Sequence, residues 1–62
     1  MRVTVNGRPV ELGDGAVAAE LVSEPRGTAV AVNGVVVSRD RLADTPLRDA
    51  DVVEVVRAVQ GG

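Results

Sequence analysis

The sequence contains no cysteine, histidine, lysine or aromatic residue. Without cysteine there is no thiolate nucleophile, and without histidine there is no general base of the usual kind at neutral pH. Without lysine there is no Schiff base and no side-chain amine to accept an isopeptide bond. A chain of 62 residues also rarely encloses a substrate pocket. We therefore do not expect a stand-alone enzyme.

A basic excess is absent as well. The formal net charge is −2, and every positive side chain is an arginine. Nucleic-acid binders usually carry a positive patch and often stacking aromatics, so this class is set aside. No apolar run is long enough to cross a membrane, and no charged-then-apolar signal segment opens the chain. The expected location is the cytoplasm.

What the sequence does have is valine. Apolar residues make up 45% of the chain, isoleucine is absent, and β-branched side chains favour half-buried strands. A domain this small usually relies on disulfides or metals, neither of which these residues suggest. We expect one domain, residues 1–62, with a valine-rich sheet under a small cover.

Two Asn-Gly pairs predict two β-hairpins, since both residues tolerate positive φ. The first is Asn6-Gly7 within residues 1–12, where alternation of Val3 and Val5 with polar residues indicates a strand with one buried side. Pro9 cannot donate a backbone hydrogen bond, so the returning strand should lie at a sheet edge. The second pair, at positions 33 and 34, joins strands expected over 28–32 and 35–38.

Between the hairpins the pattern predicts one helix over residues 16–24. Apolar residues recur there at helical spacing, Asp14 is a suitable N-cap, and Pro25 with Gly27 would end the helix. Residues 39–48 are expected to be irregular, with room for a short turn of helix, and to be anchored by Leu42 and Leu47. A turn at 49–51 and a last strand over 52–59 follow.

The element order is therefore ββαββ, an irregular stretch and a final strand. This order indicates an α+β fold of the β-grasp (ubiquitin-like) kind, a mixed sheet packed on one main helix. In such a fold the first and last strands lie side by side at the centre of the sheet.

Two segments carry a family resemblance. Residues 30–37 read VAVNGVVV, and residues 45–62 read TPLRDADVVEVVRAVQGG. Both closely resemble the family of sulfur carrier proteins of thiamin biosynthesis, which the chain resembles over essentially its whole length. The most specific feature is a closing strand that runs straight into Gly61-Gly62. Ala50 stands where the family often has glycine, and Gln60 where a small residue is common.

The resemblance implies a defined cycle. A ubiquitin-activating-like adenylyltransferase uses ATP to adenylate the Gly62 carboxylate. Sulfur from a cysteine desulfurase relay then replaces AMP and gives a C-terminal thiocarboxylate, which thiazole synthase consumes. The protein is a cosubstrate with no catalytic side chain and no bound cofactor, and a monomer is the simplest form of such a carrier.

The residues of the tail suit this cycle. Glycine lacks Cβ, so Gly61 and Gly62 make the thinnest extended rod for a narrow enzyme channel, with Gln60 and Val59 behind them. The residues Val56, Arg57 and Ala58 are candidates for docking the activating enzyme, or are ordinary residues of the last strand. Asp49 and Asp51 are interpreted as turn formers and not as a metal or acid–base pair.

Three alternatives stay open. The sulfur acceptor could belong to molybdopterin or cysteine synthesis, although those carriers tend to be longer. The domain could instead be a β-grasp interaction module that never carries sulfur. It could also be a modifier conjugated to other proteins.

Overall fold

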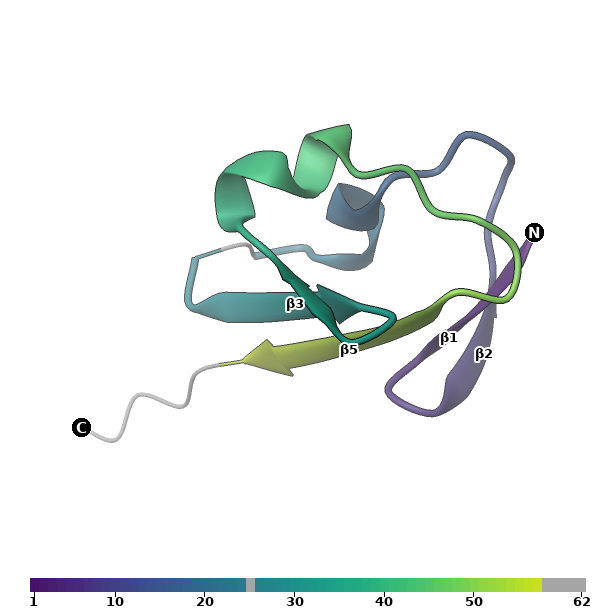
Figure 1. The fold of residues 1–62 in the computed structure, drawn as a ribbon, viewed down its shortest axis with the longest axis horizontal. Coiled ribbons are helices and arrows are strands. Elements are labelled where there is room, and N and C mark those ends of the chain that lie inside the picture. Colours follow the sequence, from purple (N-terminus) through teal and green to yellow (C-terminus); the bar gives the residue numbers. More distant parts are fainter. Residues whose placement is uncertain (25, 58–62) are drawn as a thin grey trace.

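The computed structural model describes residues 1–24 and 26–57, and its main feature is a mixed sheet of five strands (Figure 1). The strand order is β2-β1-β5-β3-β4, and β1 and β5 run parallel. This β-grasp order, with β1 and β5 adjacent at the centre, confirms the prediction. The bounds of the strands are β1 Arg2–Val5, β2 Arg8–Glu11, β3 Thr28–Val32, β4 Val35–Val37 and β5 Val52–Arg57.

Both hairpins form as predicted, and in both the turn has positive φ at each central residue. The angles are 50° and 83° at Asn6 and Gly7, and 51° and 84° at Asn33 and Gly34. These values are those of a type I′ turn, whose twist matches the twist of the flanking strands. The second hairpin is one residue shorter than expected, since β4 ends at Val37.

Strand β2 lies at the sheet edge, as Pro9 predicted. The Thr4 N–H donates to Asp51 O at 2.9 Å, so the backbone N–H and C=O of Thr4 face β5 and not β2. Its partner across the hairpin is Pro9, which therefore occupies a position whose backbone nitrogen points to solvent. The missing N–H of Pro9 leaves no bond unmade.

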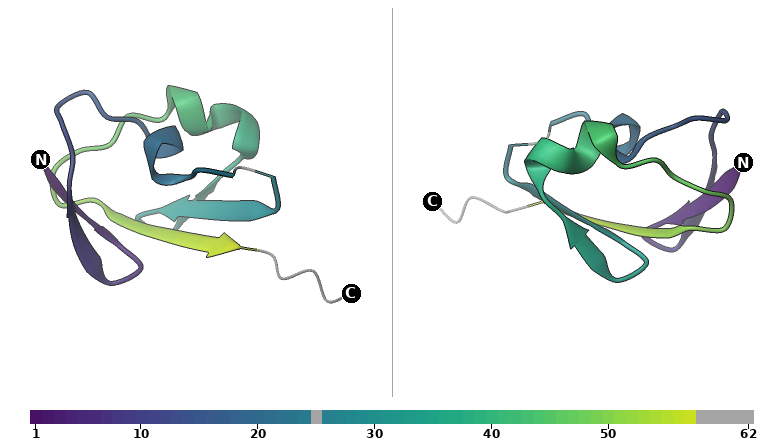
Figure 2. Two further views of the ribbon diagram at one scale, coloured as in Figure 1. Left: turned by 180° about the vertical axis from the view of Figure 1, so that it is seen from behind. Right: turned by 45° about the horizontal axis from the view of Figure 1, so that its top comes forward.

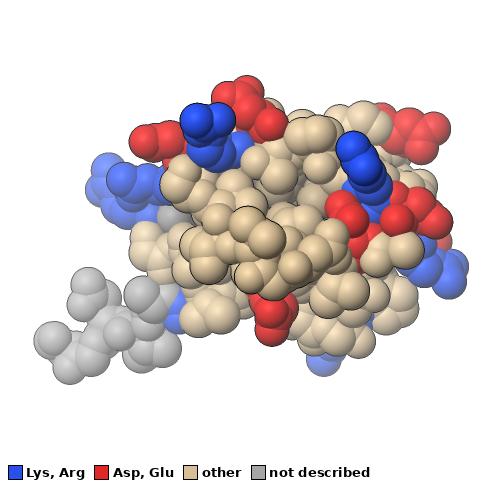
Figure 3. All heavy atoms as spheres, viewed as in Figure 1, with Lys and Arg blue, Asp and Glu red and all other residues tan. Residues whose placement is uncertain are grey.

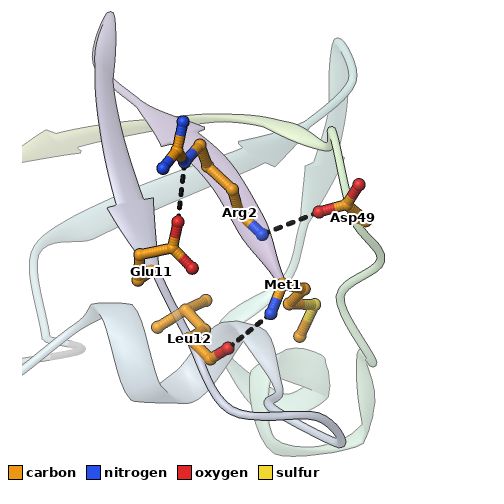
Figure 4. Close-up of polar contacts among 5 residues, drawn as sticks. All are labelled: Met1, Arg2, Glu11, Leu12 and Asp49. Atoms are coloured by element: carbon orange, nitrogen blue, oxygen red, sulfur yellow. Dashed lines mark hydrogen bonds and ion pairs between the residues drawn. The ribbon is translucent and has the colours of Figure 1, made fainter.

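The hairpin continues beyond the strand bounds at the chain start (Figure 4). The Met1 amino group donates to Leu12 O at 2.8 Å, and Leu12 N–H donates to Met1 O at 2.8 Å. On the outside, Arg2 Nε lies 2.7 Å from Glu11 Oε1, in an ion pair whose side chains are both about two-thirds exposed. Such a pair contributes less than about 1 kcal/mol. The backbone N–H of Arg2 donates a further hydrogen bond to Asp49 Oδ1 at 2.7 Å.

The predicted main helix over 16–24 is wrong. Only a 3₁₀ turn, η1 (Ala18–Leu21), forms there, and Asp14 does not cap it. The reason is that the backbone before it is bonded elsewhere: Ala18 N–H donates to Thr45 O at 2.8 Å, and Ala16 O accepts from Leu47 N–H at 2.9 Å. Val17 forms a β-bridge with Pro46, so the helix cannot begin before residue 18. With Pro25 close behind, too few residues remain for a stable α-helix.

One face of the sheet is covered by η1 and a second 3₁₀ segment, η2 (Arg39–Asp44), as Figure 2 shows from two sides. Leu42 from η2 and Leu47 after it are buried, as predicted for the irregular stretch. They meet three valines of the sheet, each at most 1% exposed. The core consists of Val3, Ala18, Val30, Leu42, Leu47 and Val53.

The turn before β5 holds Ala50 at φ 75°, in the left-handed region. Its N–H donates to Arg2 O at 2.7 Å, which fixes this conformation against β1. An alanine there costs roughly 1 to 2 kcal/mol relative to a right-handed conformation. Glycine adopts this left-handed φ without strain, which fits a position where the resembled family often has glycine.

Candidate functional site at the end of strand β5

Strand β5 is the central strand and is paired on both sides. It runs parallel to β1 through Thr4↔Val52 and Val5↔Val53, and antiparallel to β3 as far as Thr28↔Arg57. Arg57, the last residue that the structure describes, is therefore still in the sheet. Strand β5 is thus held in the sheet up to its last described residue.

The Asn6 side chain extends the β1–β5 pairing beyond the end of β1. Asn6 Oδ1 accepts from Val55 N–H at 2.8 Å, and Asn6 Nδ2 donates to Val55 O at 3.0 Å. The Asn6 backbone N–H also donates to Val53 O at 2.9 Å. The side-chain amide thus makes the two hydrogen bonds that the backbone of a further β1 residue would make. It binds β5 at Val55, two residues before Arg57.

The second turn asparagine binds the other end of β5. Asn33 Oδ1 accepts from Val52 N–H at 2.9 Å, and Asn33 N–H donates to Val52 O at 2.7 Å. Asn33 Nδ2 donates to Asp51 Oδ1 at 3.0 Å. The sequence was interpreted in terms of turn geometry alone, so these contacts with β5 were missed. The only signal for them was the choice of asparagine at the first turn position, where glycine also fits.

Asp51 is stabilised as a carboxylate. The hydrogen bond from the Asn33 side chain, and then the bond from Arg48 N–H to Asp51 Oδ2 at 2.8 Å, lower the pKa of Asp51 below its ordinary value. Partial burial acts in the opposite direction and is the weaker influence. Asp49 accepts from Arg2 N–H instead. Both carboxylates thus hold the turn, in line with their interpretation as turn formers, and among the described residues no cluster of metal-ligating side chains is present.

The predicted tail and one predicted docking residue lie outside the described residues. These are Ala58, Val59, Gln60, Gly61 and Gly62. Of the predicted site, the structure describes Val56 and Arg57, at the end of β5.

Val56 and Arg57 are both exposed but lie on opposite faces of the sheet, as neighbours on a strand must. Arg57 lines a hollow on the side of η1, together with Leu21, Val22, Ser23, Glu24, Thr28 and Val55. Val56, which is 63% exposed, faces the opposite way. The two side chains therefore cannot contribute to one flat contact surface.

The face on which Val56 lies is turned away from η1 and η2, and we term it the outer face. Its shallow hollow is largely apolar, with Glu54 as its one charged residue, and is lined by Ala29, Val30, Ala31, Val36, Glu54 and Val56. Val36 and Val52 add exposed apolar area, at 74% and 50% exposure. Exposed apolar patches often belong to surfaces that contact other molecules, so the outer face is a candidate contact surface.

No helix in the described part of the chain, residues 1–24 and 26–57, combines the length and apolar character needed to cross a membrane.

Comparison with known proteins gives a consistent result. The model of the ThiS family matches residues 3–62. A crystal structure of the thiamine biosynthesis protein ThiS from Geobacter metallireducens is 30% identical, with full coverage of both chains and a TM-score of 0.81. An NMR structure of a thiamine biosynthesis protein from the same organism is 32% identical, covering 100% of this chain and 88% of that one, with a TM-score of 0.77. No curated protein matches.

Proposed function

Because the chain belongs to the ThiS family, we propose that it is a sulfur carrier of thiamin biosynthesis whose working group is the carboxylate of Gly62. The match over residues 3–62, which includes Gly61-Gly62, is the observation that carries the proposal. The protein is a cosubstrate of other enzymes and acts in the cytoplasm.

A carboxylate is a poor electrophile, so it must first be activated. In the proposed cycle the Gly62 carboxylate attacks the α-phosphorus of ATP in a ubiquitin-activating-like enzyme, and pyrophosphate leaves. A persulfide, supplied by a cysteine desulfurase relay, displaces AMP and forms an acyl disulfide on Gly62. A thiol then reduces the S–S bond, is itself oxidised to a disulfide, and leaves a thiocarboxylate on Gly62. Thiazole synthase then takes that sulfur. The carrier binds no cofactor, since ATP is bound by its partner.

The structure supports this role through the position of β5. The strand is central, bonded to β1 and β3, and additionally held at Val55 by the Asn6 side chain. Gly61 and Gly62 lie within five residues of Arg57 and lack side chains. A glycine pair presents the narrowest backbone to an enzyme channel.

We further propose that the activating enzyme docks on the outer face through Val56. The hollow there is apolar with Glu54 in it, so the complementary surface is apolar with a basic residue. Arg57, on the other face, contacts the partner only if the partner also reaches around the end of β5.

The test is the intact mass of the protein after incubation with ATP, a sulfide source and the activating enzyme of the same cell. We expect a gain equal to the replacement of one oxygen by sulfur, localised to Gly62. An unchanged mass, with the enzyme shown to be active on another carrier, would instead support an interaction module that carries no sulfur. Adducts on lysines of other proteins would indicate a modifier.

A pair of variants tests the role of the tail. Gly62→Ala adds a Cβ at the reacting end, so we expect adenylation to fall by at least tenfold while the melting temperature stays the same. Gly13→Ala is the matched control, because a Cβ there meets nothing within 4 Å and its φ lies outside the left-handed region. Equal adenylation of both variants would refute the steric argument.

The acceptor is tested separately. Purified thiocarboxylate should supply sulfur to thiazole synthase and not to molybdopterin or cysteine synthesis. The opposite preference would keep the carrier chemistry and change the pathway.

A further inference from the structure

Both asparagines of the chain, Asn6 and Asn33, are preceded by valine and followed by glycine. In an Asn-Gly pair the glycine nitrogen can attack the side-chain amide carbon, because glycine has no side chain to obstruct the approach. Both pairs form exposed turns, and a Cβ at Gly7 or Gly34 would meet nothing within 4 Å. Water therefore reaches both reacting groups, and each turn is a candidate site of deamidation.

Deamidation requires only the chain and water. The Gly7 nitrogen loses its proton to hydroxide and forms a bond to Asn6 Cγ, the Cγ–Nδ2 bond breaks, and Nδ2 takes up a proton and leaves as ammonia. The product is a five-membered succinimide ring. Water then opens the ring at either of its carbonyl carbons, which gives aspartate or isoaspartate at position 6, and no group is oxidised or reduced.

The hydrogen bonds that the two side chains make to neighbouring groups oppose this reaction. Attack makes the amide carbon tetrahedral and expels Nδ2, so the bond that Nδ2 donates must break by every route. At Asn6 that bond goes to Val55 O at 3.0 Å, while Oδ1 accepts from Val55 N–H at 2.8 Å. Breaking two neutral hydrogen bonds of ordinary strength slows a reaction by roughly thirtyfold. The folded sheet thus gives Asn6 a limited protection.

Asn33 is held more strongly, because its Nδ2 donates to a carboxylate. The acceptor is Asp51 Oδ1 at 3.0 Å, and Arg48 N–H donates to the other carboxylate oxygen at 2.8 Å, which fixes Asp51 in place. Asn33 Oδ1 accepts from Val52 N–H, so the second bond is of the same neutral kind in both turns. Hydrogen bonds to an ionised acceptor are about twice as strong as neutral ones. The surface over the β3–β4 hairpin is mostly uncharged in the view of Figure 3, so few other ionic groups on this face compete with the contact.

We propose that Asn6 is a deamidation site of the folded protein, that its reaction loosens the hold on β5 at Val55, and that Asp51 protects Asn33 from the same reaction. In the isoaspartate product the main chain runs through Cβ and Cγ, so no side-chain amide remains and both bonds to Val55 are lost. In the aspartate product a carboxylate oxygen replaces Nδ2 and faces Val55 O without a proton to share. The modification acts on β5 two residues before Arg57, whether or not the chain carries sulfur.

The test is incubation of the protein at mildly alkaline pH, folded and in urea, followed by peptide mapping. Each deamidation replaces NH by O and adds a negative charge, so mass spectrometry and ion exchange both detect it. Dividing the rate of each site in urea by its rate in the folded protein cancels the influence of the neighbouring residues. We expect this protection factor to be roughly thirtyfold at Asn6 and about fivefold larger at Asn33.

A pair of variants tests the role of the carboxylate. Asp51→Asn removes the charged acceptor, so the protection of Asn33 should fall to that of Asn6, while Asn6 keeps its wild-type rate. Asp49→Asn is the matched control, because Asp49 accepts from Arg2 N–H and not from Asn33, and both rates should stay unchanged. Should Asp51→Asn unfold, both sites would react at their rates in urea, and the comparison of the two sites in the wild type then decides.

The consequence for β5 is measured on the isoaspartate form, separated from the other forms by chromatography. Its Val55 amide should exchange about tenfold faster than in the unmodified protein, with the Val52 amide unchanged. Three results would overturn the proposal. One is an Asn6 that stays intact in the folded protein while it reacts in urea, another is a protection factor at Asn6 equal to or above that of Asn33, and the third is unchanged Val55 exchange in the isoaspartate form.

Discussion

The contact between Asn6 and β5 allows a quantitative test of how the last strand is held. In Asn6→Gly the turn keeps a residue suited to its φ of 50°, but the two side-chain hydrogen bonds to Val55 are lost. Each such bond contributes about 1 kcal/mol net. The substitution relieves little backbone strain, because asparagine itself tolerates the left-handed region. Glycine also raises the conformational entropy of the unfolded chain, which lowers stability further.

We therefore expect Asn6→Gly to lower the free energy of unfolding by about 2 kcal/mol. A chain of this length has a total of only roughly 3 to 9 kcal/mol at typical values per residue. The melting temperature should fall by roughly 8 to 16 °C, at 4 to 8 °C for each kcal/mol in small domains. Thermal and urea melts followed by circular dichroism measure both quantities.

Amide hydrogen exchange locates the effect. The Val55 amide, which donates to Asn6 Oδ1, should exchange much faster in Asn6→Gly. Asn33→Gly is the matched control, since it removes the equivalent bond to Val52 and should speed exchange at Val52 instead. If Asn6→Gly melts within about 0.5 kcal/mol of the wild type and Val55 exchange is unchanged, the side-chain bonds contribute nothing and the argument fails.

Three further predictions concern the turn and the core. Ala50→Gly should raise the free energy of unfolding by about 0.5 to 1 kcal/mol in urea melts, because it relieves the strain at φ 75° but increases the conformational entropy of the unfolded chain. The control Ala43→Gly in η2 should lower the free energy of unfolding. A change of the same sign in both variants would refute the strain at Ala50. Because the folded pKa of Asp51 lies below the ordinary 3.8, the stability that this carboxylate adds is present above that pH and lost as pH falls through the folded value. Asp51→Asn should therefore be less stable than wild type near neutral pH, and a gap that persists undiminished in strong acid would contradict this. Val53→Asp buries an unpaired charge at a fully buried site and should abolish the folded circular dichroism signal, whereas Val52→Asp, half exposed, should fold.

Much of the sheet could be predicted from local residues. The Asn-Gly pairs favour tight hairpin turns because both residues accept a positive φ. Pro9 restricts its strand to an edge of the sheet because it has no backbone N–H to donate. The buried positions of Leu42 and Leu47 were predicted as well, as the only large apolar residues in a polar stretch. These features depend on the residue itself or its immediate neighbours.

The errors and omissions involve partners far along the chain. The helix over 16–24 was predicted from apolar spacing, but the bonds of Ala16 and Ala18 to residues 45–47 prevent it. The Asn6 and Asn33 side chains bind β5 across long sequence separations, and no local pattern reports such a contact. The candidate site follows the same division, since Val56 and Arg57 were named from sequence while their placement on opposite faces required the sheet.

The central position of β5 has a consequence for how the chain folds. The strand that joins the two hairpins into one sheet comes after all the others in sequence, and Asn6 and Val55 are 49 positions apart. Until β5 has been synthesised, β1 and β3 have no strand between them and the core valines have no shared sheet. Contacts of such high separation slow folding, toward milliseconds or longer for small domains. An isolated two-stranded hairpin is marginally stable at best. The β1–β2 hairpin is therefore not expected to be stable during synthesis until β5 is available to pair with β1.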